Sequence, residues 1–340
     1  MIGWKRMILA ALKFTNFKAL RNATLPLGSF TLIVGPNGSG KTTALQGLLI
    51  LSGQARHDYP SMASVGIKDQ EVVKIAADWK YEARSVAQTV LQFNRGGGRI
   101  SDTDANGIES GAGGPAQNYL SRVRYYSLDP RALCRNVQLQ PRMGLSEDGS
   151  GLAGVLDNLR DTSPERFEGL NAEFSRWLPE FDRILFSTPT DGARAVSLRL
   201  RGTTYGVPAT EVSQGSLLAL AILTLAYLPI PPSLVCFEEP DRGLHPRLLR
   251  DVRDALYRLA YPKKLGEERT PVQVVATTHS PYLLDLFKDH PEEVVIAQKL
   301  GHDAIFDPLA NRPDVGDILR DSHLGDAWYS GVLGGVPQDR

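Results

Sequence analysis

The stretch of this chain best suited to chemistry is a glycine-rich octapeptide that ends in Lys and Thr. It reads Gly35-Pro36-Asn37-Gly38-Ser39-Gly40-Lys41-Thr42, with Thr43 following, and it fits the pattern G-x-x-x-x-G-K-[ST]. Glycines permit a tight turn that brings backbone N–H groups to phosphate oxygens, Lys41 adds positive charge, and Thr42 offers a hydroxyl to Mg²⁺. We predict that residues 35–43 bind nucleotide phosphates; the alternative is a chance match in a Gly-rich surface loop.

The segments on either side of this loop fit the same prediction. Residues 30–34 (FTLIV) form a short apolar run typical of a buried strand, and residues 41–51 (KTTALQGLLIL) carry apolar residues at helical spacing. Strand, loop and helix in this order place the phosphates at a helix N-terminus, where the helix dipole and backbone N–H groups favour anions.

A second candidate is the apolar segment 233–237 (SLVCF), which ends in two carboxylates, Glu238 and Glu239. Phosphate hydrolysis needs a metal to spread the charge on the phosphates and a base to orient water. Glu238 can hold Mg²⁺ or its water, and Glu239 can act as the general base. The alternative is a buried strand with a solvated acidic end.

Polar residues also occupy the ends of two further predicted elements. Ser213 and Gly215 precede a strongly apolar helix, where a hydroxyl and bare backbone N–H groups suit phosphate. A plain N-cap would equally explain Ser213. His279 follows a predicted strand at 272–277, and a His there can hydrogen-bond a γ-phosphate, although a structural role is the alternative.

In the order phosphate loop, S-x-G helix, acidic strand and His, these motifs resemble ATP-binding-cassette (ABC) type ATPases. The resemblance is closer to the SMC, RecF and OLD side of that class than to transporters. Residues 13–18 (KFTNFK) are similar to the "NFK" lead-in of SMC-like heads. Residues 238–246 (EEPDRGLHP) and 324–331 (LGDAWYSG) are similar to a bacterial group of predicted ATPases with an EEPxxGLHP motif.

The resemblance implies a fold, a reaction and a partner. The fold is α/β: a P-loop NTPase, like an ABC or SMC head, with a mostly parallel sheet flanked by helices, an antiparallel β-subdomain and a small helical insertion. Two heads pair head-to-tail around two ATP molecules, with Mg²⁺ at Thr42 and Glu238. In each site Glu239 activates water, His279 contacts the γ-phosphate, and Ser213 and Gly215 come from the other subunit.

The sequence departs from the ABC pattern in three places. The metal-side acid is Glu238 where the class usually has Asp, and the signature reads Val-Ser-Gln-Gly instead of Leu-Ser-Gly-Gly. The glutamine of the Q-loop has two candidates, Gln138 and Gln140, for which an exposed loop position is the alternative.

We expect residues 1–340 to form a single ATPase head. Within it we predict a β-subdomain at 52–130 with a flexible Gly/Ser/Asp-rich loop at 94–117, and a helical insertion at 131–183. The remaining lobe, 184–340, alternates helix and strand from residue 213 onward, which argues for a mostly parallel sheet. The interval between Thr42 and Ser213 is too short for the long coiled-coil arm of SMC proteins, and we expect any nuclease effector to be on another chain.

Composition excludes few partners. Lys and Arg number 38 and Asp and Glu number 38, so the formal net charge is zero and no anionic partner is required. Two cysteines, Cys134 and Cys236, suit a reducing compartment. The most apolar stretch, 217–230, is shorter than the about 20 residues that span a bilayer, so we expect a cytoplasmic protein with no membrane partner.

Three functions remain open at this stage. The first is a dimerising ATPase switch that acts on DNA or on an effector subunit in DNA repair or anti-phage defence. The second is an ATP-dependent scaffold with little turnover, and the third is the ATPase subunit of a transporter. Basic faces for DNA could be formed by Arg194, Arg199 and Arg201, and by Arg242, Arg247, Arg250 and Arg253. Ordinary salt bridges, with Asp251 and Asp254 among the second group, are the alternative.

Overall fold

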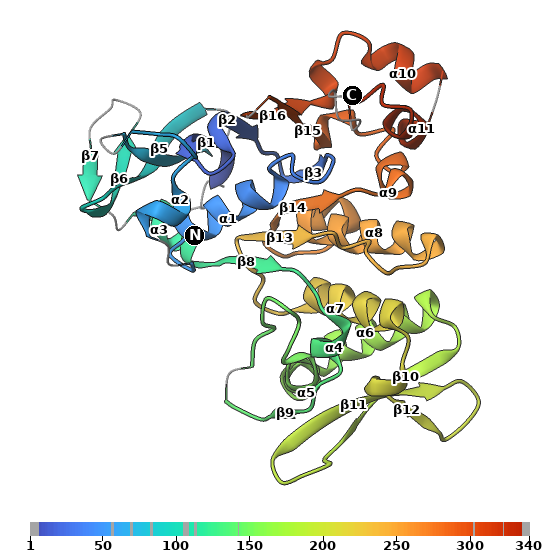
Figure 1. Cartoon of the computed structure of the whole chain (residues 1–340). Helices are drawn as coiled ribbons and strands as arrows, with labels where there is room; N and C mark the ends of the chain where they lie inside the picture. Colours follow the sequence, from blue (N-terminus) through green and yellow to red (C-terminus); the bar gives the residue numbers. More distant parts are fainter. Residues whose placement is uncertain are drawn as a thin grey trace. The chain divides into compact units, whose positions relative to one another are not determined.

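In the computed structural model the chain divides into two compact units. Figure 1 labels the helices and strands that form them. Unit 1 comprises Met1–Val123, Ser233–Cys236 and Gln273–Arg340, and unit 2 comprises Arg124–Pro232 and Phe237–Val272. The structure describes residues 7–55, 58–68, 71–81, 84–104, 109–111, 114–141, 143–301, 303–321 and 323–334.

The sheet that carries the phosphate loop has six strands in the order β16-β15-β3-β14-β13-β8. These strands are β3 (Phe30–Val34), β8 (Val123–Tyr126), β13 (Leu234–Glu238), β14 (Gln273–Thr278), β15 (Val294–Leu300) and β16 (Asp303–Pro308). Both β14 and β15 run parallel to β3, and β16 pairs antiparallel with β15 at the edge. Every residue of β3 and β14 is buried, as expected for central strands of a parallel sheet that is covered on both faces. The predicted α/β class is confirmed.

Helix α1 (Lys41–Leu51) follows the phosphate loop and buries its apolar side against the first strands of the chain. Gly47 allows this approach, because a Cβ there would lie 2.5 Å from the Phe14 ring. The lead-in at 13–18 ends β1 (Met7–Phe17), and Lys18 Nζ donates to Gln46 Oε1 of α1 at 2.8 Å.

A second six-stranded sheet in unit 1 is antiparallel, in the order β2-β1-β4-β5-β6-β7. After β1 its strands are β2 (Leu20–Pro26), β4 (Val73–Tyr81), β5 (Arg84–Asn94), β6 (Gly97–Asp104) and β7 (Glu109–Gly111). The antiparallel subdomain therefore draws two strands from before the phosphate loop, which the predicted range 52–130 omits.

The region 94–117 differs from the expected flexible loop. It contains β6, β7 and the start of α3 (Pro115–Ser121), while residues 105–108 and 112–113 lie outside the described part. Gly96 and Gly97 turn the chain between β5 and β6, and β6 then pairs along its full length with β5. The strand is polar because it lies near the edge of the sheet, and its composition alone predicts a loop.

Unit 2 combines helices with a small antiparallel sheet. Its longer helices are α5 (Leu152–Thr162), α6 (Pro164–Trp177), α7 (Gln214–Tyr227) and α8 (Leu249–Ala260). The sheet contains β9 (Val137–Gln138), β10 (Phe181–Ser187), β11 (Ala193–Leu200) and β12 (Gly206–Pro208). Residues 216–227 of α7 are all buried, so its apolar sequence is that of a core helix. Among the described helices, none has the length and apolarity needed to cross a membrane.

The remaining helices are short. They are α2 (Tyr59–Met62), α4 (Pro130–Leu133), α9 (Pro281–Asp285), α10 (Val315–Asp321), α11 (Leu324–Tyr329), and the 3-10 turns η1 (Ala209–Glu211), η2 (Pro246–Leu248), η3 (Pro262–Leu265), η4 (Pro291–Glu293) and η5 (Leu309–Asn311). The tail that resembles predicted ATPases forms α11, which packs against α9, the helix that begins two residues after His279.

Candidate nucleotide-binding site

The phosphate loop in unit 1 connects the end of β3 to α1, as the sequence predicts. Gly35 is required for close packing, because a Cβ there would lie 2.5 Å from the Ala297 carbonyl oxygen and 2.6 Å from Ser39 Oγ. Gly38 and Gly40 adopt left-handed backbone angles, with φ of 76° and 94°. Gly40 is the N-cap of α1 and supplies no side-chain cap, so the helix N-terminus has the form that suits phosphate.

Two buried polar side chains in the loop fit a phosphate ligand. Lys41 is only 6% exposed, and its Nζ donates to the carbonyl oxygens of Gly35 at 2.8 Å and Pro36 at 3.0 Å. Ser39 is fully buried, and its hydroxyl has no hydrogen-bond partner in the described structure. A buried donor without a partner is costly unless a ligand satisfies it. The residues present therefore fit a nucleotide with its Mg²⁺, for which Thr42 is the adjoining hydroxyl.

His279 follows the carboxyl end of β14, and the phosphate loop follows the carboxyl end of the neighbouring strand β3. Strand β14 pairs in parallel with β3, and Thr278 is directly opposite Val34. Both strands thus end together, one leading into the phosphate loop and the other into His279, which is half-buried. Ser280 Oγ then accepts from Leu283 N and caps α9. The topology of unit 1 brings together these two motifs, which lie far apart in the sequence.

The signature residues lie at the start of α7 in unit 2. Ser213 is the N-cap of this helix, and its Oγ accepts from Ser216 N at 3.2 Å and is 2.7 Å from Ser216 Oγ. The capping role that we considered as an alternative is therefore present. Gly215 faces the loop after the acidic strand, because a Cβ there would lie 3.0 Å from the Gly243 carbonyl oxygen. The helix N-terminus and that loop are thus in close contact within unit 2.

The two carboxylates follow each other at the end of β13 but differ in their backbone. Glu238 is the last residue of the strand, and its Oε2 accepts a hydrogen bond from Tyr125 Oη. Glu239 has a φ of 46°, one of three positive values among described non-glycine residues. An L-residue in this left-handed region is strained, and such strain often occurs at functional sites. Arg242 N donates to the Glu239 carbonyl oxygen at 2.9 Å and closes a turn.

A third carboxylate, Glu147, interacts electrostatically with Glu238. Partial desolvation raises the pKa of this surface residue, and the negative charges of Glu238 and Asp148 raise it further. The neighbouring Asp148 has a lowered pKa because the backbone N–H and hydroxyl of Ser150 donate to it. Our reading of the sequence missed Glu147 and Tyr125, since each reaches Glu238 through the fold and neither belongs to a local motif.

Both candidates for the Q-loop glutamine lie in unit 2, and this role stays a prediction for each. Gln138 lies in β9 and pairs with Ala193 of β11 in the small antiparallel sheet of unit 2. Gln140 is an exposed loop residue, as the alternative explanation held. The residues that follow β8 are Ser127, Leu128 and Asp129. Ser127 N and Asp129 N donate to the carbonyl oxygens of Glu147 and Asp148, each at 2.9 Å.

Several arginines considered for DNA contacts are engaged within unit 2. Arg194 pairs with Asp157 at 3.0 Å, Arg199 with Asp182 at 2.7 Å and Arg253 with Asp254 at 2.6 Å. Arg201 donates to the Pro179 carbonyl oxygen at 2.5 Å, and Arg247 to that of Trp177 at 3.3 Å. These contacts favour the salt-bridge explanation over a continuous basic face. Arg242 and Arg250 are exposed.

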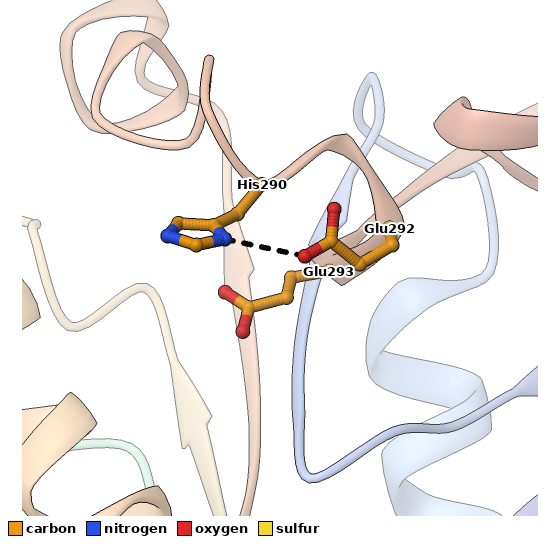
Figure 2. A group of neighbouring side chains, drawn as sticks. All are labelled: His290, Glu292 and Glu293. Carbon is orange, nitrogen blue, oxygen red and sulfur yellow. Dashed lines mark hydrogen bonds and ion pairs between the residues drawn. The ribbon is translucent and has the colours of Figure 1, made fainter. Parts of the chain in front are cut away.

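Figure 2 shows a further group of metal-ligand types, His290, Glu292 and Glu293, at η4. Their ligand atoms lie within 4.8 Å of one another, and His290 Nδ1 is 3.2 Å from Glu292 Oε1. The group precedes β15, which runs parallel to β3, so it lies toward the amino ends of these strands, away from the phosphate loop. Because all three ligands come from one turn, we assign no metal to them.

Two family models match separate parts of the chain. A family described as "AAA ATPase domain" matches residues 7–90, which include the phosphate loop. A family described as "AAA domain, putative AbiEii toxin, Type IV TA system" matches residues 144–285, which include Ser213, Glu238, Glu239 and His279. An OLD nuclease from Thermus scotoductus (strain ATCC 700910 / SA-01) is 23% identical over 368 residues, covering 91% of this chain and 68% of the relative.

Solved structures with this fold include SMC heads. One, bound to the C-winged helix domain of ScpA, has a TM-score of 0.60 at 14% identity and covers 88% of this chain and 96% of its own. Another, derived from Pyrococcus furiosus and bound to the C-terminal domain of ScpA, has a TM-score of 0.61 at 13% identity and covers 93% and 100%. In sequence the chain is thus similar to AAA ATPase domains and to an OLD nuclease, and it has the fold of SMC heads, which supports an SMC/RecF/OLD-like ATPase.

Proposed function

We propose that this protein binds and hydrolyses ATP as an ABC-type ATPase that dimerises head-to-tail. The observation that carries the proposal is the phosphate loop itself: a buried lysine, a buried serine hydroxyl without a partner in the described structure, and a glycine-lined turn at the N-terminus of α1. The buried Ser39 hydroxyl supports the proposal because a phosphate oxygen would give it the partner that it lacks within the described structure.

In this proposal residues 35–43 hold the phosphates, and Thr42 and Glu238 hold Mg²⁺. Bound Mg²⁺ supplies positive charge to the β- and γ-phosphates. Glu239 takes a proton from the attacking water, and its fixed left-handed backbone restricts the direction in which its side chain leaves the strand. His279, at the sheet edge shared with the loop, hydrogen-bonds the γ-phosphate and so distinguishes ATP from ADP.

Ser213 and Gly215 would complete the ATP site of a second copy. ATP then binds the paired state more tightly than the open one and shifts the population toward the dimer. The role as a switch on DNA or on an effector, in DNA repair or anti-phage defence, rests on the resemblance to OLD and SMC proteins. The arginine pairs in unit 2 weaken the case for DNA as the partner, and steeply salt-dependent DNA binding would restore it.

A scaffold with little turnover is the second candidate, and Glu239 argues against it. A binding module has no use for a base, and a strained Glu that served no reaction would be replaced by Gly at no cost. The transporter subunit is less well supported, because the NFK-type lead-in and the EEP strand resemble the SMC side.

The test measures molecular mass in solution and ATP hydrolysis with and without ATP and Mg²⁺, for the wild type and for Glu239→Gln. We expect ATP to convert monomer to dimer, and Glu239→Gln to stop hydrolysis and prolong the dimer. Lys41→Ala is the matched control that should neither bind ATP nor dimerise. If Glu239→Gln hydrolyses ATP normally, the proposed role of Glu239 is wrong. If ATP binds but the molecular mass never changes, the proposed role of Ser213 is wrong.

A further inference from the structure

We propose that Tyr125 is a positioning residue that orients the Glu238 carboxylate for the Mg²⁺-nucleotide complex. This inference rests on the proposed ATPase function and adds to it a residue that belongs to none of the ATPase motifs. Tyr125 lies on β8, next to β13 in the strand order, and its Oη donates to Glu238 Oε2. Tyr125 is buried, with 9% of its surface exposed.

The proposed role explains the departure at the metal-side acid. Glu has one more rotatable bond than the Asp usual in the ABC class, so its carboxylate has more positions to sample and loses more entropy when fixed. A phenol that donates to one oxygen removes much of that freedom before metal binds. A carboxylate has about four acceptor positions on two oxygens, so accepting from Tyr125 leaves capacity for metal or its water.

The surroundings of Tyr125 hold it in place. The next residue, Tyr126, packs its ring against Phe237, the residue before Glu238, with centroids 5.6 Å apart. Just beyond β8, the backbone N–H of Ser127 donates to the Glu147 carbonyl oxygen at 2.9 Å. The chain is thus anchored at the two residues that follow Tyr125, within unit 2. Such a rigid supporting contact is what a precisely placed ligand requires.

The test compares Tyr125→Phe with Tyr126→Phe. Both substitutions remove one hydroxyl from adjacent buried tyrosines, but only the first removes the hydrogen bond to Glu238. A fluorescent ATP analogue is titrated in EDTA and at increasing Mg²⁺, which reports binding independently of turnover. A thermal melt of each variant confirms folding.

For Tyr125→Phe we expect the Mg²⁺ concentration at half-maximal effect to rise roughly ten-fold, about the effect of losing one hydrogen bond to a charged group. The affinity in EDTA should stay at the wild-type value. Tyr126→Phe should leave both quantities unchanged. In a Glu238→Gln background, Tyr125→Phe should have no further effect, because the oriented carboxylate is already gone.

An unchanged Mg²⁺ midpoint in Tyr125→Phe would overturn the positioning role and leave the ATPase proposal intact. An equal change in Tyr126→Phe would also overturn it, since the effect would then come from packing. Failure of the proposed function has a different result: the wild type would bind no ATP analogue with or without Mg²⁺, and both proposals would fall together.

Discussion

The phosphate loop in unit 1 and the segment around Glu238 in unit 2 are built in different ways. In unit 1 the phosphate loop is one continuous segment whose shape comes from its own backbone, with left-handed glycines and a lysine bonded to loop carbonyls. In unit 2 the surroundings of Glu238 are assembled from separate segments. Tyr125 donates a hydrogen bond to the Glu238 carboxylate, and Gly215 closely contacts the loop that follows the acidic strand. Phosphate binding by the loop should therefore depend on local backbone geometry, and the action of Glu238 on contacts between distant segments.

The largest effect is expected from Gly35→Ala. The new Cβ would lie 2.5 Å from the Ala297 carbonyl oxygen, which belongs to the backbone of β15 and cannot move aside cheaply. The loop must shift, and we expect ATP affinity to fall at least about 100-fold, equivalent to about 2.7 kcal/mol. Titration with a fluorescent ATP analogue measures this.

The matched control for that substitution is Gly316→Ala, also in unit 1. A Cβ at Gly316 meets no atom within 4 Å, and the residue lies inside α10, where Ala is the better helix former. This variant should bind ATP like the wild type. If Gly35→Ala also binds like the wild type, the loop adapts and its geometry does not determine binding.

Two substitutions at Glu239 separate the strain of its backbone from the chemistry of its carboxylate. Glu239→Gly and Glu239→Ala both remove the carboxylate, and both should abolish hydrolysis while ATP still binds. Only Gly adopts a φ of 46° without strain, so Glu239→Gly should be more stable than Glu239→Ala by about 1 kcal/mol. Urea denaturation of the two proteins measures the difference, and equal midpoints would show that this backbone is not strained.

A smaller effect is expected from Gly215→Ala. Its Cβ would lie 3.0 Å from the Gly243 carbonyl oxygen, so the start of α7 must move by a few tenths of an ångström. We expect a loss of about 1 kcal/mol in unfolding free energy and a weaker ATP-driven dimer, with ATP affinity unchanged. Gly144→Ala, in open space within unit 2, is the control. A fall in ATP affinity of the isolated head would contradict the assignment of Gly215 to the partner's site.

The same contrast explains how much the sequence predicts. The phosphate loop, its strand and α1 were predictable, because their residue types and conformations are set over a short stretch. Glu238 and Glu239 were predictable as a strand end, but Tyr125 was not, because it meets Glu238 only through the pairing of β8 and β13. The strands β6 and β7 were missed for a related reason: their polar sequence is stabilised by pairing at the edge of a sheet. The roles of the site residues stay predictions.

The substitution with the smallest expected effect on stability at neutral pH is Tyr126→Phe. Burial raises the pKa of this phenol from 10.0 to about 12, partly offset by Arg124. The folded state therefore favours the protonated phenol, and this contribution is fully present below pH 10 and is lost as the pH rises toward about 12. Over that window the unfolding free energy of Tyr126→Phe should fall less steeply with pH than that of the wild type. The two slopes should differ by up to about 1.4 kcal/mol per pH unit.

Urea denaturation at pH 8 and at several values above pH 10 measures this slope. The control is Tyr329→Phe, whose side chain is 86% exposed and so changes its surroundings little on folding. Its slope should match the wild type. If Tyr126→Phe also follows the wild-type slope, burial of this ring does not contribute to the alkaline unfolding of unit 2, and the strand that positions Tyr125 would be anchored mainly by its backbone.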